Sequence, residues 1–156
     1  MFSQTTEYAL RVIVYLASLG GKPATIPQIA AATRTPEGYT AKVLRNLALS
    51  GLVQSQRGLR GGSVLARAAS TITVFDVVQA VDPIKRIDTC PLGLKGHGVN
   101  LCPLHYRMDQ AIGLVEQALR KSTIAELVAT STGSKPLCDT PVVITVKKQS
   151  RPAARR

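Results

Sequence analysis

The sequence predicts a mainly α fold with a small β wing, in which a winged helix-turn-helix precedes a long dimerisation helix. Three observations predict this fold. Two short amphipathic helices joined by a tight turn are expected within residues 25–49. A glycine-rich segment flanked by two strand-like runs follows over residues 52–66. An apolar seam then recurs at helical spacing over residues 104–121.

The first expected helix spans residues 4–19 and ends at Gly20. Its apolar residues recur at the i, i+3, i+4, i+7 and i+8 spacing of a helix with one buried face: Ala9, Val12, Ile13, Leu16 and Ala17. The second helix begins at a capping box, Thr25 to Gln28, and is short. This second helix is the first of the two helices of the expected helix-turn-helix.

The third expected helix has Thr35 as its N-cap and Pro36 at its first position, and it runs to about Leu49. Its outer face carries the candidates for nucleic-acid contact: Tyr39, Thr40, Lys42, Arg45 and Asn46. A charged outer face is equally typical of a helix that is simply solvated. The segment that follows therefore has to decide between the two interpretations.

Residues 52–56 and 63–66 are typical of strands, with glycines and arginines between them. Glycine permits a tight hairpin tip and a close backbone approach to a partner. Arg57, Arg60 and Gly61 are therefore candidates to contact phosphates or the minor groove. A nucleotide-phosphate loop is the alternative, but the Walker lysine pattern is absent. A hairpin directly after a helix-turn-helix predicts a wing.

The second half begins with a capping box at Thr73 and a short helix to about Val81. A loop over residues 84–104 leads to the long helix, whose seam is Met108, Ile112, Val115 and Leu119, widened by Ala111, Leu114 and Ala118. Such a seam is either core or a dimer contact. We expect a homodimer, because duplex-binding proteins commonly use two-fold symmetry to contact two half-sites.

Charge is distributed unevenly around a net charge of +11. Residues 1–67 carry eight basic and two acidic residues, residues 68–134 carry six of each, and residues 135–156 carry six basic and one acidic. Such a surplus favours nucleic acid as the partner. An aromatic content of 4% without tryptophan argues against a stacking platform for single strands. The composition therefore favours duplex DNA.

We expect three regions: a winged helix-turn-helix over 1–82, a cysteine loop and dimerisation helix over 83–130, and a flexible basic tail over 131–156. The apolar run over 9–17 is too short to span a bilayer and contains Arg11. No secretion signal is visible, so we expect a cytoplasmic protein with reduced thiols and no membrane partner.

Cysteine and histidine are concentrated in one loop. Two of the three cysteines and both histidines fall between Cys90 and His105, and Cys90 and Cys102 are each followed by Pro-Leu. Because thiolates bind soft or borderline metals and imidazole can share the site, the loop is a candidate sensor. The alternative is that both cysteines are small buried hydrophobes. Cys138 is interpreted as an incidental thiol.

The sequence resembles the Rrf2 family of bacterial winged-helix regulators. The matching motifs, in chain order, are EYALRV at 7–12, GLV at 51–53, RGLRGG at 57–62, LAR at 65–67, ITVFDVVQAV at 72–81 and the loop from Cys90 to His105. The likeness covers residues 1–130. It implies a homodimeric DNA-binding transcriptional regulator, often a repressor. Many members hold an iron–sulfur cluster whose state changes DNA affinity.

The resemblance also implies a ligand set. The usual family loop has three cysteines separated by five residues, and here Gly96 occupies the middle position between Cys90 and Cys102. His105 and Glu7 match positions that supply ligands in some members, Glu7 acting from the other subunit. A family histidine falls at Arg11, which cannot be a ligand. The preferred site is a [2Fe–2S] cluster held by the ligands Cys90, Cys102, His105 and Glu7 of the other chain.

Other chemistries stay open for the same loop. Zinc would be held by Cys90, His97, Cys102 and His105, although the spacing is not that of a standard zinc finger. A cluster-free regulator would sense oxidants through Cys90 or Cys102. An enzyme with a cysteine nucleophile beside His105 lacks a third orienting group, so we expect no catalysis. A nonspecific architectural protein is the remaining alternative.

Overall fold

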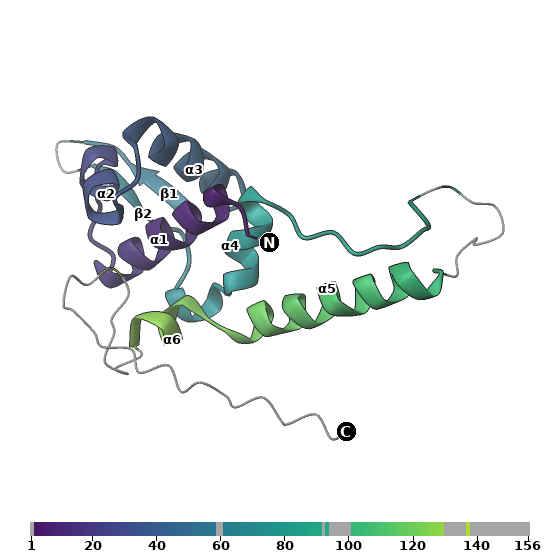
Figure 1. The fold of residues 1–156 in the computed structure, drawn as a ribbon. Helices are drawn as coiled ribbons and strands as arrows, with labels where there is room; N and C mark the ends of the chain where they lie inside the picture. The colour runs from purple at the N-terminus through teal and green to yellow at the C-terminus, as the bar shows by residue number, and fades with distance from the viewer. Residues whose placement is uncertain (1, 59–60, 92, 94–100, 130–136, 138–156) are drawn as a thin grey trace, which may run out of the picture.

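A computed structural model describes residues 2–58, 61–91, 93, 101–129 and 137. A helical body carries one long helix along its side (Figure 1). The elements are α1 (Gln4–Ser18), α2 (Ile26–Thr33), α3 (Glu37–Leu49), β1 (Val53–Gln56), β2 (Gly62–Leu65), the 3₁₀ turn η1 (Ala69–Thr71), α4 (Val74–Val81), α5 (Pro103–Lys121) and α6 (Ile124–Ala129). The predicted mainly α fold with a small β wing is confirmed.

Helix α1 is the centre of the body and contacts α2, α3, α4 and α6. Ser3 caps its start by accepting a hydrogen bond from the Thr6 amide at 3.2 Å. The predicted stripe is buried except for Ala17, which is half-buried. With the other fully buried side chains the stripe forms one core, which includes Val12, Ile13, Ile29, Val43, Leu47, Leu52, Ile72, Val77 and Ile124. Burial of each such side chain contributes roughly 1.5–3 kcal/mol, so this core dominates stability.

The turn of the helix-turn-helix is made at Arg34, which adopts the left-handed conformation with φ 53°. The predicted capping box of α2 is present, with the Thr25 amide donating to Gln28 Oε1 at 2.9 Å. The predicted N-cap of α3 is wrong, because Pro36 occupies that position. Thr35 is buried, and its hydroxyl is 3.1 Å from that of Thr33, so it does not cap the helix.

The predicted wing is an antiparallel hairpin of β1 and β2, in register from Val53 opposite Leu65 to Gln56 opposite Gly62. Ala24 pairs with Ser63 on the other edge of β2 through hydrogen bonds of 2.8 and 3.1 Å. A Cβ at Gly62 would lie 2.5 Å from the Ala24 carbonyl oxygen, so this crossing requires glycine. The hairpin is thereby fixed to the segment before α2.

After α5 the chain returns to the winged-helix body. The Ile124 amide donates to the Ile72 carbonyl and the Val74 amide to the Ser122 carbonyl, both at 2.9 Å. Ile124 is fully buried in the core. The division at residues 82 and 130 stays a prediction, and the tail predicted over 131–156 lies outside the described residues apart from Leu137.

The apolar run over residues 9–17 is too short to span a bilayer, so the sequence predicts no membrane-spanning segment there. Among the helices of the described residues, none combines the length and apolar character that crossing a membrane demands.

Candidate functional site

The outer face of α3 carries most of the predicted DNA-contacting side chains. Tyr39, Lys42 and Arg45 are exposed, and Asn46 is half-buried. Thr40 differs from the expectation: it is fully buried, and its hydroxyl donates to the Pro36 carbonyl at 3.1 Å. Helical spacing turns this residue toward the core together with Val43 and Leu44, so we remove Thr40 from the contact set.

Tyr39 is held in place by α1. Its ring packs edge-on against that of Tyr8, with centroids 5.5 Å apart and an interplanar angle of 75°. The two hydroxyls of Tyr39 and Thr5 lie 3.3 Å apart. The Lys42 Nζ sits 5.7 Å from the centroid of the Tyr39 ring. These contacts place an aromatic ring and a cation side by side on the exposed face of α3.

The wing contributes Arg57, which is exposed directly after β1. Gly61 closes the hairpin, because its amide donates to the Gly58 carbonyl at 2.9 Å. A Cβ at Gly61 would overlap the Gln56 carbonyl oxygen, so a turn requirement accounts for this glycine. Arg60 lies outside the described residues.

The predicted sensor loop begins with a buried cysteine and ends at the start of α5. Cys90 is 8% exposed, and Cys102 is half-buried at the N-cap of α5. The Cys102 Sγ and His105 Nδ1 atoms lie 3.3 Å apart, so a thiol and an imidazole converge within the first helical turn. His97 and Gly96 lie outside the described residues.

Glu7 is exposed on α1 and its Oε1 accepts from the Arg11 Nε at 2.9 Å. Arg11 also donates to the Thr33 carbonyl at 3.4 Å, and its Cζ lies 5.8 Å from the Tyr8 ring centroid. Within the described part of one chain, no three cysteine, histidine or carboxylate side chains gather as a metal site. Glu7 and Cys90 are therefore not joined to the Cys102–His105 pair within a single subunit.

A clamp that the sequence does not predict joins α5 to the segment that leads to Cys90. The Arg86 Nε donates to Asp109 Oδ1 at 2.7 Å, its Nη2 binds the second carboxylate oxygen, and the Ile87 amide donates to Oδ1 at 2.9 Å. The hydrogen bond from Arg86, followed by that from the Ile87 amide, lowers the pKa of Asp109 to about 2. The same hydrogen bond raises the pKa of Arg86. The sequence held one signal for this contact, namely an acidic residue, Asp109, among the apolar residues of the predicted seam.

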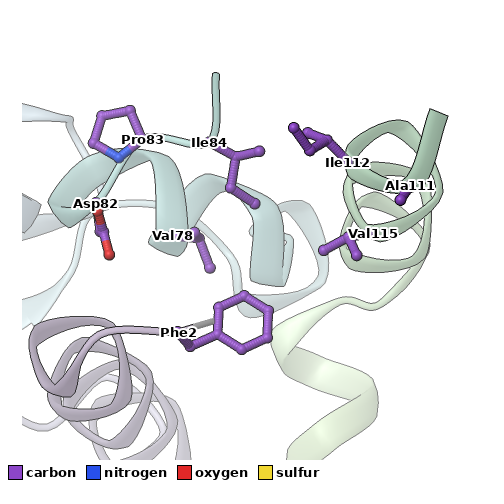
Figure 2. Close-up of a pocket in the computed structure, with 8 residues that line it drawn as sticks. All are labelled: Phe2, Val78, Asp82, Pro83, Ile84, Ala111, Ile112 and Val115. Carbon is purple, nitrogen blue, oxygen red and sulfur yellow. The ribbon is translucent and has the colours of Figure 1, made fainter. Parts of the chain in front are cut away.

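The apolar side chains of helix α5 are unevenly covered. The predicted seam residues Ile112 and Val115 are half-buried and line a cavity of about 320 Å³ with Phe2, Val78 and Ile84 (Figure 2). The predicted seam residue Met108 is exposed at 48%, and so is Leu114, which was expected to widen the seam, at 68%. Leu104 at 64% and Tyr106 at 54% are exposed as well. No residue of α5 is buried in one chain.

Comparison with known proteins agrees with this geometry. The sequence profile of the Rrf2 family, described as iron-dependent transcriptional regulators, matches residues 2–130. The chain belongs to the Rrf2 family. It is 36% identical over 135 residues to the protein aau3 of Rhizobium meliloti (strain 1021). The alignment covers 81% of this chain and 83% of that protein. A protein of Aquifex aeolicus (strain VF5), named as an HTH-type transcriptional regulator, is 28% identical over 131 residues and covers 82% and 91%.

Solved structures with the Rrf2 fold match this chain as well. IscR of T. potens has a TM-score of 0.67 at 23% identity, covering 81% of this chain and 85% of that one. CymR of B. subtilis, the global cysteine regulator, has a TM-score of 0.66 at 25% identity, covering 81% and 95%. This Rrf2 protein is thus a DNA-binding transcriptional regulator with a winged-helix fold, and its relatives include proteins named as regulators.

Proposed function

We propose that this Rrf2 protein represses transcription by binding a palindromic operator as a homodimer, with its DNA affinity set at the loop from Cys90 to His105. The observation that carries the proposal is the exposed, basic face of α3, whose aromatic residue is anchored on α1. A helix with this outer face, followed directly by a basic hairpin, suits the major groove and the adjacent backbone.

Different residues have different parts in DNA binding. Lys42 and Arg45 contact phosphates or major-groove edges, and Tyr39 adds contacts that depend on the base. Arg57 and Arg60 act from the wing, where Gly61 permits the tight tip. Phosphate contacts give affinity and orientation, and base contacts give specificity.

Dimerisation uses α5. Its apolar side chains Leu104, Tyr106, Met108 and Leu114 are too exposed for a helix that functions alone in water. Helical spacing places Leu104 and Met108 on the same face as Ile112 and Val115. A second copy packed against the first turns of α5 would bury Leu104 and Met108, while Ile112 and Val115 keep their contacts with the body. The dimer places two α3 helices on one side of a duplex with half-sites about 34 Å apart or a multiple of that spacing.

The sensor uses ligands from both subunits. We propose that Cys90, Cys102 and His105 hold a [2Fe–2S] cluster together with Glu7 of the partner subunit. The Cys102–His105 pair fits in chemistry and distance, since both atoms suit a soft or borderline metal. A cluster with two thiolates and N or O ligands would supply a centre with a raised reduction potential. In the single chain the Arg11 guanidinium binds the Glu7 carboxylate, and a metal ligand at Glu7 would replace this contact.

Anaerobic purification of the full chain, followed by an absorption spectrum and metal analysis, tests the sensor. We expect a coloured protein with iron and sulfide, and loss of the colour in Cys102→Ser and in His105→Ala. A colourless protein with one zinc per chain would contradict the cluster and would indicate a zinc site at the same Cys102–His105 pair. A metal-free protein whose DNA binding changes on thiol oxidation would leave a thiol sensor in its place.

A further inference from the structure

Gly38 is a glycine that no contact within the described chain explains. Every other glycine that the structure describes either has a positive φ or would bring an added Cβ into contact with a neighbouring group. Gly38 has neither property, because its φ is not positive and a Cβ there would have open space around it. It lies in α3, and inside a helix glycine is less favourable than alanine. The residue therefore destabilises α3 with no steric reason among the described residues.

Gly38 lies in the middle of the exposed face of α3. The buried side chains of α3 all fall on the side of the helix opposite to it. Lys42 and Arg45 follow Gly38 at the i+4 and i+7 positions, so the three residues form one row along the helix. Both basic side chains are exposed. Because helical side chains lean toward the N-terminus, Lys42 and Arg45 extend toward the turn that contains Gly38.

Two exposed side chains border the glycine and leave it uncovered. The Tyr39 ring is held toward α1 by its edge-on contact with Tyr8, and its hydroxyl lies 3.3 Å from that of Thr5. The Lys42 Nζ lies 5.7 Å from the centroid of the Tyr39 ring. The first turn of α3 therefore presents bare backbone at Gly38 beside an aromatic ring and a cation.

We infer that Gly38 is the point at which the backbone of α3 comes closest to the DNA duplex, so that its missing side chain sets how deeply the helix enters the major groove. The first residues of the second helix in a helix-turn-helix contact base edges. Glycine permits a backbone to approach a ligand closely. The inference rests on the proposed function, since it adds Gly38 to the DNA contacts of α3. It makes Gly38 a residue that determines specificity, because base edges lie deeper than the phosphates.

A series of side chains at Gly38 tests the inference in the full chain. Gly38→Ala and Gly38→Leu add increasing bulk, and both new residues favour helix more than glycine does. One probe is a duplex that the wild type selects from a randomised library, and the other is a duplex of the same length and composition in scrambled order. Fluorescence anisotropy at a fixed salt concentration measures the affinity for both. Ala48→Leu is the matched control, because Ala48 is exposed in the last turn of the same helix.

We expect Gly38→Ala to weaken binding to the selected duplex about fivefold and Gly38→Leu about 100-fold, the range expected for losing part or all of a base contact. Binding to the scrambled duplex should change by less than about twofold, because phosphate contacts do not need the full depth of the groove. Urea denaturation should show both variants to be at least as stable as the wild type. Ala48→Leu should bind both duplexes as the wild type does.

The double variant Lys42→Ala, Arg45→Ala separates failure of this inference from failure of the proposed function. If the double variant loses the selected duplex while both Gly38 variants keep wild-type affinity, α3 contacts DNA and the inference about Gly38 is wrong. If the double variant keeps wild-type affinity, or if the wild type selects no duplex, the proposed interface fails and the inference fails with it.

Three further results would overturn the inference alone. Equal losses on the selected and scrambled duplexes would show that Gly38 affects DNA binding in general rather than the approach to base edges. A less stable Gly38→Ala protein would show that the fold itself requires the glycine. An equal loss in Ala48→Leu would show that bulk anywhere on the exposed part of α3 has the same effect.

Discussion

The ring of Tyr39 on α3 packs edge-on against that of Tyr8 on α1, although 31 residues separate them in the chain. Tyr8 also accepts a hydrogen bond from Gln4 at 2.8 Å and lies under the Arg11 guanidinium. Tyr39 in turn lies under Lys42. A continuous series of contacts therefore joins Glu7, the proposed ligand on α1, to the exposed face of α3.

Removing the Tyr8 ring should weaken DNA binding without unfolding the protein. Edge-on aromatic pairs contribute about 0.5–1.5 kcal/mol beyond burial, so Tyr8→Leu should lower operator affinity by roughly two- to tenfold. Fluorescence anisotropy with a labelled operator measures the change. Tyr15→Leu is the matched control, because Tyr15 is on the same helix and packs against no other aromatic ring among the described residues. Equal losses in both variants would contradict a specific role for the pair.

Single substitutions of basic residues should separate phosphate contacts from other roles. Arg57→Ala should weaken binding to all duplexes and reduce the slope of log K against log salt by about one unit. Lys42→Ala and Arg45→Ala should do the same or relax specificity at single base pairs. Lys121→Ala, on α5, should leave the slope unchanged. An unchanged slope in Arg57→Ala would remove the wing from the proposed interface.

Acid should release the clamp on α5. The pKa of Asp109 is lowered to about 2 in the folded protein, below its ordinary value near 4. A carboxyl with a depressed pKa stabilises the folded state fully above its ordinary pKa, and this stabilisation is lost as pH falls through the folded value. The difference in unfolding free energy between wild type and Asp109→Asn should therefore be constant from pH 8 to 5.

Below that range the difference should shrink, with most of the loss between about pH 4 and pH 2. Urea denaturation at a series of pH values measures it. A difference that instead disappears above pH 5 would place the stabilisation on another group and would contradict the assignment to Asp109.

Two glycines should respond in opposite directions to alanine. Gly62→Ala should destabilise the protein by about 1–3 kcal/mol, because the new Cβ collides with the Ala24 backbone at the only crossing that ties the hairpin to residue 24 in the described chain. Gly38 is in α3 with open space around it, so Gly38→Ala should stabilise by up to about 1 kcal/mol. Urea denaturation compares the two, and equal effects would contradict the steric argument.

Local signals in the sequence predicted the elements of the fold well. Capping boxes at Thr25 and Thr73, the glycines after α1 and the apolar spacing of α1 are all short-range, and the structure confirms each of them. Thr35 shows the limit of such signals. It has the side chain of an N-cap, but burial beside Thr33 directs its hydroxyl elsewhere.

The candidate site was predicted in part. The exposure of Tyr39, Lys42 and Arg45 follows from helical spacing, whereas the burial of Thr40 depends on how α3 meets the core. Contacts across long stretches of chain had no local signal. Arg86 and Asp109 are 23 residues apart on either side of a loop, so only the folded chain brings them together.

The central claim is that α3 and the wing recognise a palindromic operator. Selection from a library of randomised duplexes, with the protein both as purified anaerobically and after chelation, tests it most directly. We predict enrichment of a palindrome whose half-sites are about 34 Å or a multiple apart in at least one state. The Lys42→Ala, Arg45→Ala double variant should lose this enrichment. Failure to enrich any palindrome in either state, or the same palindrome selected by the double variant, would contradict the claim.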